Sequence, residues 1–523
     1  MQIAHISYRE TNRFSSLILD YIEEKEALRS FYTKFPSEEN LLELAGKRRF
    51  STVQRETISK VLLEQNVNPT EKQAINLELI NEDNTFTVTT GHQLCLFGGP
   101  LYFFLKIISC INLTKKLNAL KTSSNFIPVF WMASEDHDFE EINHIHLFGK
   151  KVEWKRDFGE HVGEMKLASI EVFKNELFEI LGDSAQGKEL KELFEACYSS
   201  TKTLSEATRL FVHRLFAEEG LLILDANNSS LKRAFKPFMQ QEIESALTFK
   251  SVRTSIDSFP KEYKIQANPS ECNLFYLDNS KRKKIKRQSN EYFLQDTTIS
   301  QQELLNLLED SPEKFSPNVL FRPLYQEFVL PNIAYVGGGG ELAYWLELKK
   351  SFESFDVDFP ALVLRNSVLI LDQGAVKKIE KFSFSEIDLF KTSDELIKKH
   401  TLKAVEEDLF IEEKKQVKVI FNEIKEKLIE VDKSLGQAAG SEEQKLLNGL
   451  DKLNAKRLKA IKNKSAVEVQ QIQNVLEKLF PNHGLQERKE NFASFYMKYG
   501  QSFLSDLLEK LDPLNTSFSV LKP

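Results

Sequence analysis

The chain has 523 residues, enough to bury a large core and to form more than one domain. Of its residues, 41% are hydrophobic and 28% are charged, a composition that argues against long disordered regions. The formal net charge of -7 gives the chain no overall attraction to nucleic acid. Composition and charge therefore favour a folded globular protein and exclude one that binds nucleic acid through a global positive charge.

The cysteines and the N-terminal residues indicate the cellular compartment in which the protein is expected. The four cysteines are scattered and form no C-x-x-C pair, which is typical of free thiols in a reducing compartment. The first ten residues lack the basic and apolar regions of a secretory signal. The most membrane-like segment, 94–113, is broken by Gly98-Gly99-Pro100 and contains Lys106, so a buried helix explains it better than a membrane span. We therefore expect a cytoplasmic protein without a membrane-spanning segment.

Residues 1–80 are predicted to be helical, because apolar residues recur among charged ones. After residue 80 strands alternate with helices, and the first helix of this alternating part is predicted at 101–120. Each predicted strand is short, apolar and rich in β-branched or aromatic residues. The five predicted strands are 86–90, 126–131, 221–225, 333–336 and 361–364. Because helical segments separate most of them, we expect a parallel sheet with right-handed crossovers.

The interval between the third and fourth strands is too long for one crossover helix and is predicted to hold inserted structure. It contains a predicted helix at 231–249, a hairpin at 273–294 and a second helix at 300–308. The second helix begins with Ser300 followed three residues later by Glu303, the pattern of a capping box. The hairpin carries a basic run at 281–287, which we interpret as a solvated hairpin or loop.

After residue 372 lysine, glutamate and leucine dominate, and apolar residues take the spacing of a coiled coil. From 417 to 435 they recur at alternating intervals of four and three residues. A break is predicted at 436–441, and a second, less regular helix follows and ends at Pro481. The two helices are predicted to form an antiparallel hairpin that packs on the core or on a second subunit. A last helical region is expected at 486–511.

The first predicted strand ends in a polar, glycine-rich turn that opens a helix. Such a connection brings the carboxyl end of a strand and the free N–H groups of a helix together at a ligand site. The turn is not G-x-G-x-x-G and no Walker lysine follows, so neither a dinucleotide fingerprint nor a P-loop is present. A tight turn with a capping histidine is the alternative. The candidate substrate-binding residues of this turn are Gly91, His92, Gln93, Gly98 and Gly99.

The second predicted strand is followed by a cluster of acidic residues and histidine. A carboxylate or a neutral imidazole can take the proton that an amine loses when it attacks a carbonyl group. Five of the nine histidines lie between positions 92 and 161, so a zinc or manganese site is the alternative. No H-E-x-x-H motif is present, and we predict no bound metal. The candidate catalytic residues are Glu135, Asp136, His137 and Asp138, and Asn143 is a candidate for substrate binding.

A third polar loop follows the strand at 333–336. Its four glycines before a helix favour an anion, whereas Glu341 in the first turn disfavours an adjacent phosphate. This balance favours contact with a sugar, a nucleoside or an amino group. Arginines near the loop could bind a carboxylate of the substrate, and the alternative is that they form structural salt bridges. The candidate binding residues are Gly337, Gly338, Glu341, Tyr344, Asn318, Arg322 and Arg365.

Several motifs along the chain carry a family resemblance. In chain order they are T-G-H-Q at 90–93, F-G-G-P-L-Y at 97–102, P-V-F-W at 128–131, E-D-H-D at 135–138, S-P-N-V at 316–319, R-P at 322–323, Gly337-Gly338 with Glu341 and Tyr344-Trp345, and Q-E-R at 486–488. They resemble the bacillithiol biosynthesis cysteine-adding enzyme (BshC) family, and the resemblance spans nearly the whole chain. Three positions depart from the family pattern: His92 and Cys95 stand where the family usually has Gln and Gly, and Gly339 stands where Pro is common. These departures argue against an essential role of those three side chains.

The resemblance implies an α/β fold with a Rossmann-like parallel-sheet core related to class I nucleotidyltransferases. Helical insertions and an antiparallel coiled-coil hairpin, which mediates homodimerisation, complete the implied architecture. The implied domains are a first part of the core with N-terminal helices at 1–232, an inserted connecting domain at 233–317, a second part of the core at 318–372, a coiled-coil region at 373–482 and a C-terminal helical segment at 483–523.

The resemblance also implies a ligase that joins the carboxyl of cysteine to the amine of glucosaminyl-malate, giving bacillithiol. Amide formation from a free acid needs activation, and a nucleotide, ATP or ADP, is plausible from the fold. One alternative is a nucleotidyltransferase with another acceptor, although the chain lacks the H-I-G-H and K-M-S-K-S loops that would support it. The other is a non-enzymatic coiled-coil scaffold that only binds a ligand. Neither nucleic acid nor a membrane is an expected partner.

Overall fold

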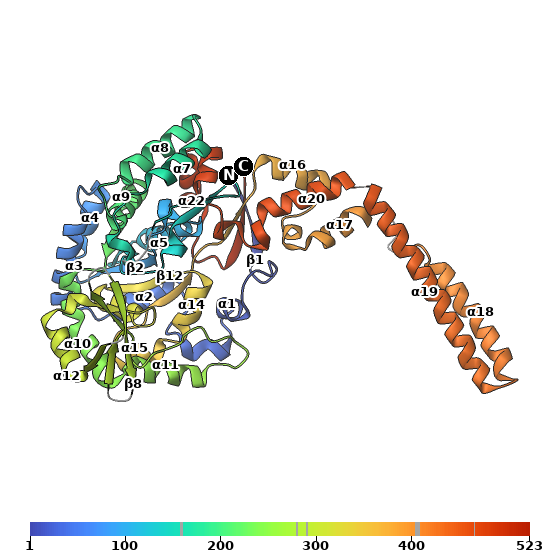
Figure 1. Ribbon diagram of the computed structural model, residues 1–523, viewed down its shortest axis with the longest axis horizontal. Coiled ribbons are helices and arrows are strands. Elements are labelled where there is room, and N and C mark those ends of the chain that lie inside the picture. Colours follow the sequence, from blue (N-terminus) through green and yellow to red (C-terminus); the bar gives the residue numbers. More distant parts are fainter. Residues whose placement is uncertain (157–160, 279–280, 289–290, 296, 403–407, 465) are drawn as a thin grey trace. The chain divides into compact units, whose positions relative to one another are not determined.

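The computed structural model describes residues 1–156, 161–278, 281–288, 291–295, 297–402, 408–464 and 466–523 (Figure 1). The chain divides into two units, of which the first comprises Met1–Leu369 with Gly484–Leu521. The second unit comprises Ile370–His483 with Lys522–Pro523. No helix in the described part of the chain is long and apolar enough to cross a membrane.

A five-stranded sheet forms the centre of the first unit, with the order β13-β12-β2-β3-β6. Each neighbouring pair in it is parallel. Its strands are the five that the sequence predicts, so the α/β fold with a parallel-sheet core is confirmed. They are β2 (Thr85–His92), β3 (Asn125–Met132), β6 (Leu222–Asp225), β12 (Asn332–Gly337) and β13 (Ala361–Leu364).

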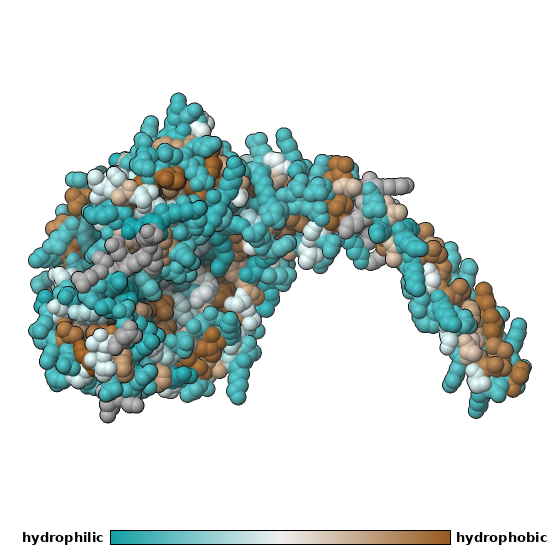
Figure 2. Space-filling model, in the orientation of Figure 1, coloured by the Kyte–Doolittle hydropathy of each residue, from teal (hydrophilic) through white to brown (hydrophobic). Residues whose placement is uncertain are grey.

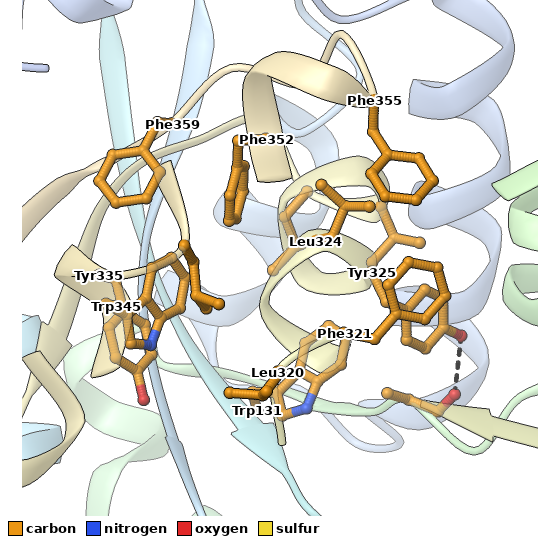
Figure 3. Packing of buried hydrophobic residues seen from close by; sticks show 14 of the residues in the cluster. Trp131, Leu320, Phe321, Leu324, Tyr325, Tyr335, Trp345, Phe352, Phe355 and Phe359 are labelled. Atoms are coloured by element: carbon orange, nitrogen blue, oxygen red, sulfur yellow. Dashed lines mark hydrogen bonds between the residues drawn. The ribbon is translucent and has the colours of Figure 1, made fainter. Parts of the chain in front are cut away.

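Both faces of this sheet are buried, because alternate side chains of its strands enter two different hydrophobic cores. Val336 and Val363 pack in one core, and their neighbours Tyr335 and Leu362 pack in the other. In the second core the rings of Tyr335 and Trp345 stack, with centroids 4.4 Å apart (Figure 3). This packing fixes the strand ends from which the polar loops emerge.

Helices flank the sheet, and the helix predicted at 101–120 is α5 (Tyr102–Ala119), most of whose residues are buried. The helices before the sheet are α1 (Ser16–Ile22), α2 (Glu38–Lys47), α3 (Thr52–Gln65) and α4 (Glu71–Leu79). Those that follow β3 are α6 (Phe139–Ile142), α7 (Glu171–Leu181), α8 (Ala185–Cys197) and α9 (Leu204–Phe216), with the small hairpin β4 (His144–Leu147) and β5 (Lys150–Glu153). Those near and after β12 are α13 (Arg322–Val329), α14 (Gly339–Leu346), α15 (Lys349–Ser354), α21 (Ala493–Tyr499) and α22 (Ser502–Lys510).

The prediction that residues 1–80 are wholly helical is wrong at the N-terminus. The segment Gln2–Ser7 forms β1, which pairs with β15 (Ser517–Lys522) in a three-stranded sheet that also contains β14 (Val368–Ile370). Only one residue of β1 is buried, so the strand has no apolar alternation for a sequence pattern to detect. Its partner lies at the other end of the chain.

The inserted segment contains a second five-stranded sheet, with the order β10-β9-β8-β7-β11. The antiparallel strands of the predicted hairpin are confirmed, but the segment forms three strands rather than two: β7 pairs with β8, and β8 pairs with β9. Residues 279–280 and 289–290 of this segment lie outside the described residues. The capping box of Ser300 and Glu303 is confirmed too. The helix predicted at 231–249 is instead two helices, because Ala246 adopts left-handed dihedral angles (φ 49°, ψ 45°). The elements are α10 (Ser229–Ser245), α11 (Leu247–Ser258), β7 (Leu274–Asp278), β8 (Lys281–Gln288), β9 (Glu291–Leu294), β10 (Thr297–Ser300), α12 (Gln301–Asp310) and β11 (Phe315–Pro317).

The second unit contains the coiled-coil hairpin, but its turn lies earlier than the sequence predicts. The segment 436–441 is helical, and the chain turns between α18 and α19 instead. A Cβ atom on Gly436 would lie 2.6 Å from Cγ1 of Ile429, so this glycine allows close packing of the two helices beside the turn rather than breaking a helix. The helices are α16 (Gln373–Phe382), α17 (Ser393–Leu402), α18 (Ile411–Ile429), α19 (Lys433–Lys464) and α20 (Ala466–Leu479).

Candidate active site

A cavity of about 620 Å³ opens beyond the carboxyl ends of β2, β3 and β12 in the first unit. Open parallel sheets bind ligands at this edge, and the volume is within the range of small-molecule sites. The cavity brings together predicted residues from three loops that are far apart in the sequence. Those that line it are Gly91, His92, Gln93, Glu135, Asp136, His137, Asn318, Arg322, Gly338, Glu341, Tyr344 and Arg365.

Five other predicted residues do not line this cavity. Two of them lie with His137 in a neighbouring cleft, where Asp138 accepts a hydrogen bond from the backbone N–H of Glu141 at the start of α6. The glycines of the first turn serve packing: a Cβ on Gly98 would lie 2.6 Å from the Phe104 ring. The five residues are Gly98, Gly99, Asp138, Asn143 and Gly337.

Several residues that line the cavity were missed by the sequence interpretation. The basic run on β8 is not a solvated surface throughout, because Arg282 and Lys284 both face the cavity. Their spacing of two residues places them on the same face of a strand, and this spacing could have indicated their role. Lys106 was recognised only as an argument against a membrane span. The missed residues include Lys106, Asn268, Ser270, Phe275, Arg282, Lys284, Tyr335 and Arg488.

In the first loop His92 is buried and neutral. Burial, reinforced by the nearby charge of Lys106, lowers the pKa of His92 to about 4. Its Nδ1 lies 3.0 Å from the carbonyl oxygen of Gln93, which can only accept, so Nδ1 carries the hydrogen. The ring packs beside Tyr102 and Phe103. His92 therefore offers its Nε2 as an acceptor and supplies no positive charge near pH 7.

In the second loop Asp136 is held by hydrogen bonds to both of its oxygens. Oδ1 accepts from the backbone N–H of His137 at 2.7 Å, and Oδ2 accepts from Nε2 of Gln93 at 2.7 Å. Burial alone would raise the pKa of Asp136, but the hydrogen bonds from His137 and Gln93 hold it well below its usual range. Asp136 is thus a fixed anion that orders the loop and is a weak base.

In the third loop Glu341 is engaged on both oxygens by the protein. Nζ of Lys106 donates to Oε1 and Oε2 at 2.9 and 2.8 Å, the Tyr335 hydroxyl donates to Oε1 at 2.6 Å, and the Gly338 N–H donates to Oε2 at 2.9 Å. Burial alone would raise the pKa of Glu341, but these partners lower it to about 2. Lys106 also donates to the carbonyl oxygen of Gly91. This ion pair therefore joins the first loop to the third.

Three arginines, Arg282, Arg322 and Arg365, supply much of the positive charge of the cavity, and each of the three is fixed by other protein groups. Nη2 of Arg365 donates to Oε1 of Glu487 at 2.7 Å, while its buried Nε has no hydrogen-bond partner in the described part of the chain. Arg282 donates to Oγ of Ser316 and lies over the ring of Phe275 at 4.1 Å. Such anchored guanidinium groups are suited to bind carboxylates with little loss of side-chain entropy.

The acidic and histidine residues of the loops are not arranged as metal ligands. Within the described ranges no group of three or more His, Cys, Asp or Glu side chains could hold a metal ion. What the cavity offers is a set of fixed cations and carboxylates around a volume that fits a small polar molecule. The arrangement suits the binding of a multiply charged substrate and the transfer of a proton.

Comparison with known proteins agrees with this geometry. Residues 1–366 match the family model described as the N-terminal Rossmann-like domain of bacillithiol biosynthesis BshC, and residues 368–523 match its C-terminal coiled-coil domain. The chain is 41% identical over 524 residues to a protein of Flavobacterium johnsoniae, with 99% of each chain covered. It is 42% identical to a protein of Christiangramia forsetii, with 99% of this chain and 98% of the relative covered. Both relatives carry the name "Putative cysteine ligase BshC". The chain therefore belongs to the BshC family of bacillithiol biosynthesis.

Proposed function

We propose that the protein is a cysteine ligase of bacillithiol biosynthesis, which forms the amide between the carboxyl of cysteine and the amine of glucosaminyl-malate. Full-length similarity to proteins named as cysteine ligases supports the reaction. In this chain the proposal rests on one observation: the cavity is lined by both positive and negative groups, the anchored arginines and the ionised carboxylates. Glucosaminyl-malate itself has two carboxylates and an amine, and so has the complementary charges.

The arginines would bind the malate part of the substrate. Arg322 begins α13, donates to Oε1 of Gln326 at 3.0 Å and lies 6.0 Å from the centre of the Tyr335 ring. Arg365 and Arg282 are held in the same way by neighbouring groups, and all three line the cavity. Charge-assisted bonds from such arginines to the two malate carboxylates would orient the sugar and its amine toward the carboxylates of the second loop.

We further propose that a nucleotide such as ATP or ADP takes part in activating the cysteine carboxyl. A free carboxylate is a poor electrophile, so the reaction needs a leaving group on the acyl carbon. Lys284 and Arg488 line the cavity and have no ion-pair partner in the part of the chain that the structure describes, which leaves both free for a phosphate. The location at the carboxyl edge of a parallel sheet is also where nucleotides bind in related architectures.

The four cysteines are free and buried, which is consistent with our proposal of a cytoplasmic location. Their burial also keeps them from acting as nucleophiles: it raises the pKa of Cys95 to about 12. The only thiol that the reaction needs is that of the substrate.

We also propose a homodimer that forms through the coiled-coil hairpin. No residue of α18 is buried, and the hairpin exposes large apolar side chains, which Figure 2 shows in brown. Such a seam is stable when a second apolar surface covers it. The exposed side chains of α18 and α19 include Val419, Ile420, Ile424, Leu446 and Leu453, which are 59%, 54%, 37%, 49% and 54% exposed.

Replacing both Ile424 and Leu428 by aspartate should convert the dimer into a monomer, because charges would enter the apolar seam. Light scattering should report half of the wild-type mass. Lys415→Asp places the same side chain on the opposite face of α18, where Lys415 is exposed, and should leave the mass unchanged. An unchanged mass after the double substitution would contradict dimerisation through this seam.

Deletion of the gene in its own host tests the proposed reaction in cells. The deleted strain should lose bacillithiol and accumulate glucosaminyl-malate, because the amide bond between cysteine and glucosaminyl-malate is no longer formed. Expression of the wild-type chain should restore the thiol. Bacillithiol at the wild-type level in the deleted strain would exclude the proposed function.

A further inference from the structure

Residues 135–138 follow β3, and they differ in whether a side-chain atom is free to take a proton from a substrate. Both oxygens of Asp136 accept protein hydrogen bonds, and Asp138 lies outside the main cavity. His137 has a side chain that is 53% exposed. Glu135 lines the cavity with a side chain only 13% exposed, and its Oε2 has no hydrogen-bond partner among the residues that the structure describes. Glu135 is therefore the sheltered carboxylate of this loop with a free oxygen.

The charge of Glu135 is balanced by a lysine from the inserted segment. Nζ of Lys232, on α10, lies 2.5 Å from Oε1 of Glu135. The same nitrogen donates to Oδ1 of Asn227 at 2.8 Å and to the carbonyl oxygen of Glu313 at 2.8 Å. The ammonium group of Lys232 therefore forms an ion pair with Glu135 and donates hydrogen bonds to two further acceptors. Lys232 is only 1% exposed and cannot itself contact a substrate.

The lysine site is also tied to the main sheet. The backbone N–H of Asn227 donates to Oδ1 of Asp225, the last residue of β6, at 3.0 Å. The position of Lys232 is thus fixed by the same strand ends that carry the cavity loops. A buried charge pair with this many partners holds its side chains in one geometry.

We propose that Lys232 is a positioning residue that holds Glu135 in place and turns its free oxygen toward the substrate amine. This inference rests on the proposed ligase function. In the amide-forming step, a C–N bond forms between the amine nitrogen of glucosaminyl-malate and the acyl carbon of activated cysteine. The bond from that carbon to its leaving group, a phosphate or nucleotide derived from a nucleoside triphosphate, breaks. The proton of the amine passes to Oε2 of Glu135.

Lys232→Met tests this role in the purified full-length protein, because methionine keeps the length of the side chain and removes its charge. We expect kcat to fall about 100-fold, the low end of what a general base contributes. The KM values for glucosaminyl-malate and cysteine should stay within about threefold, since no binding contact is lost. A lysine with a purely structural role would not separate kcat from KM in this way.

A matched control lies one turn further along the same helix. Lys236 forms an exposed ion pair with Glu309, with distances of 2.7 and 2.8 Å to its two oxygens. Lys236→Met removes a Lys–Glu pair from α10 without touching the cavity and should leave kcat within about twofold of wild type. A similar loss in both variants would mean that the helix, rather than the Glu135 contact, is what matters, and would overturn the proposal.

A double-mutant comparison decides whether Lys232 acts through Glu135. Glu135→Gln should lower kcat at least as much as Lys232→Met, and the double variant should be no slower than the slower single variant. Multiplied losses would overturn the proposal. Should Lys232→Met fail to fold, Asn227→Ala removes one acceptor of the ammonium. Its expected loss, about fivefold in kcat, should vanish in the Glu135→Gln background, and an unchanged kcat would overturn the proposal.

The failure of this inference can be told apart from failure of the proposed function. Bacillithiol made at the wild-type rate by Lys232→Met would refute only the role of Lys232. No bacillithiol from the wild-type protein and from Lys236→Met would refute the ligase function, and the inference with it.

Discussion

Replacing Lys106 by methionine should lower the free energy of unfolding by about 3 kcal/mol and abolish most activity. Lys106 is 2% exposed, and its ammonium bridges Glu341 to the carbonyl oxygen of Gly91. Its loss leaves a largely buried carboxylate without its counter-charge. The expected cost is at the low end of the range for broken buried pairs, because the side chain of Glu341 is 30% exposed. Activity should fall because the two loops that Lys106 joins both line the cavity.

Urea unfolding measures this loss, and Lys116 provides the control on the same helix. Lys116 pairs with Asp512 at 2.7 Å, but its side chain is 33% exposed. Lys116→Met should therefore cost no more than about 1 kcal/mol. Equal losses in the two variants would contradict the role assigned to the Lys106–Glu341 pair.

The pH dependence of the difference between wild type and Lys106→Met is a second readout of the same pair. The pKa of Glu341 is lowered to about 2 in the folded protein from the ordinary 4.5. A carboxyl whose pKa is depressed stabilises the fold above its unfolded pKa, and this contribution is lost as the pH falls through the folded value. The stability gap should therefore be full at pH 7 and shrink as the pH falls from 4.5 toward 2. A gap independent of pH would contradict the assignment.

Arg365→Gln should lower the free energy of unfolding by about 3–5 kcal/mol, the full range for breaking a buried pair. The side chains of Arg365 and Glu487 are only 4% and 0% exposed. Glu487 also accepts from the backbone N–H of Val368 at 2.7 Å, so it cannot move away to find water. Because Arg365 lines the cavity, the KM for glucosaminyl-malate should rise at least about tenfold in addition.

Two further variants separate charge from packing in this prediction. Arg49 pairs with Asp356 on the surface, with side chains 65% and 84% exposed, so Arg49→Gln should cost no more than about 1 kcal/mol. Adding Glu487→Gln to Arg365→Gln removes the uncompensated charge and should restore part of the lost stability. Calorimetry or urea unfolding would measure each value. A double variant less stable than Arg365→Gln alone would show that the lost charge pair is not the cause.

The sheet could be predicted because each of its strands is a short apolar run between helical segments. Phe86 and Phe126, for example, lie in such runs and pack in the same core. The strand β1 could not be predicted, since its partner β15 is at the far end of the chain and its own side chains are mostly exposed or half-buried. The turn of the coiled coil was misplaced because Gly436 was interpreted as a helix breaker, whereas it allows close helix packing.

The cavity could be predicted in part, because residues at the ends of neighbouring parallel strands must lie close together. Gln93 and Asp136 follow β2 and β3 and form a hydrogen bond across this edge. Residues that reach the cavity from other elements gave no comparable signal. Arg282 comes from the inserted sheet, and Lys106 from the interior of a helix whose apolar pattern hides it. The apolar periodicity of a segment predicts which of its faces is buried, but it does not predict which other element packs against that face.

Product formation by the purified protein tests the central claim most directly. The protein would be incubated with glucosaminyl-malate, cysteine and each candidate nucleotide in turn, and the mixture examined by mass spectrometry. A product with the mass of glucosaminyl-malate plus cysteine minus water, absent without protein and reduced in Glu135→Gln, is the result that a cysteine ligase predicts. Unchanged substrates with every nucleotide, at protein concentrations where the fold is intact, would contradict it.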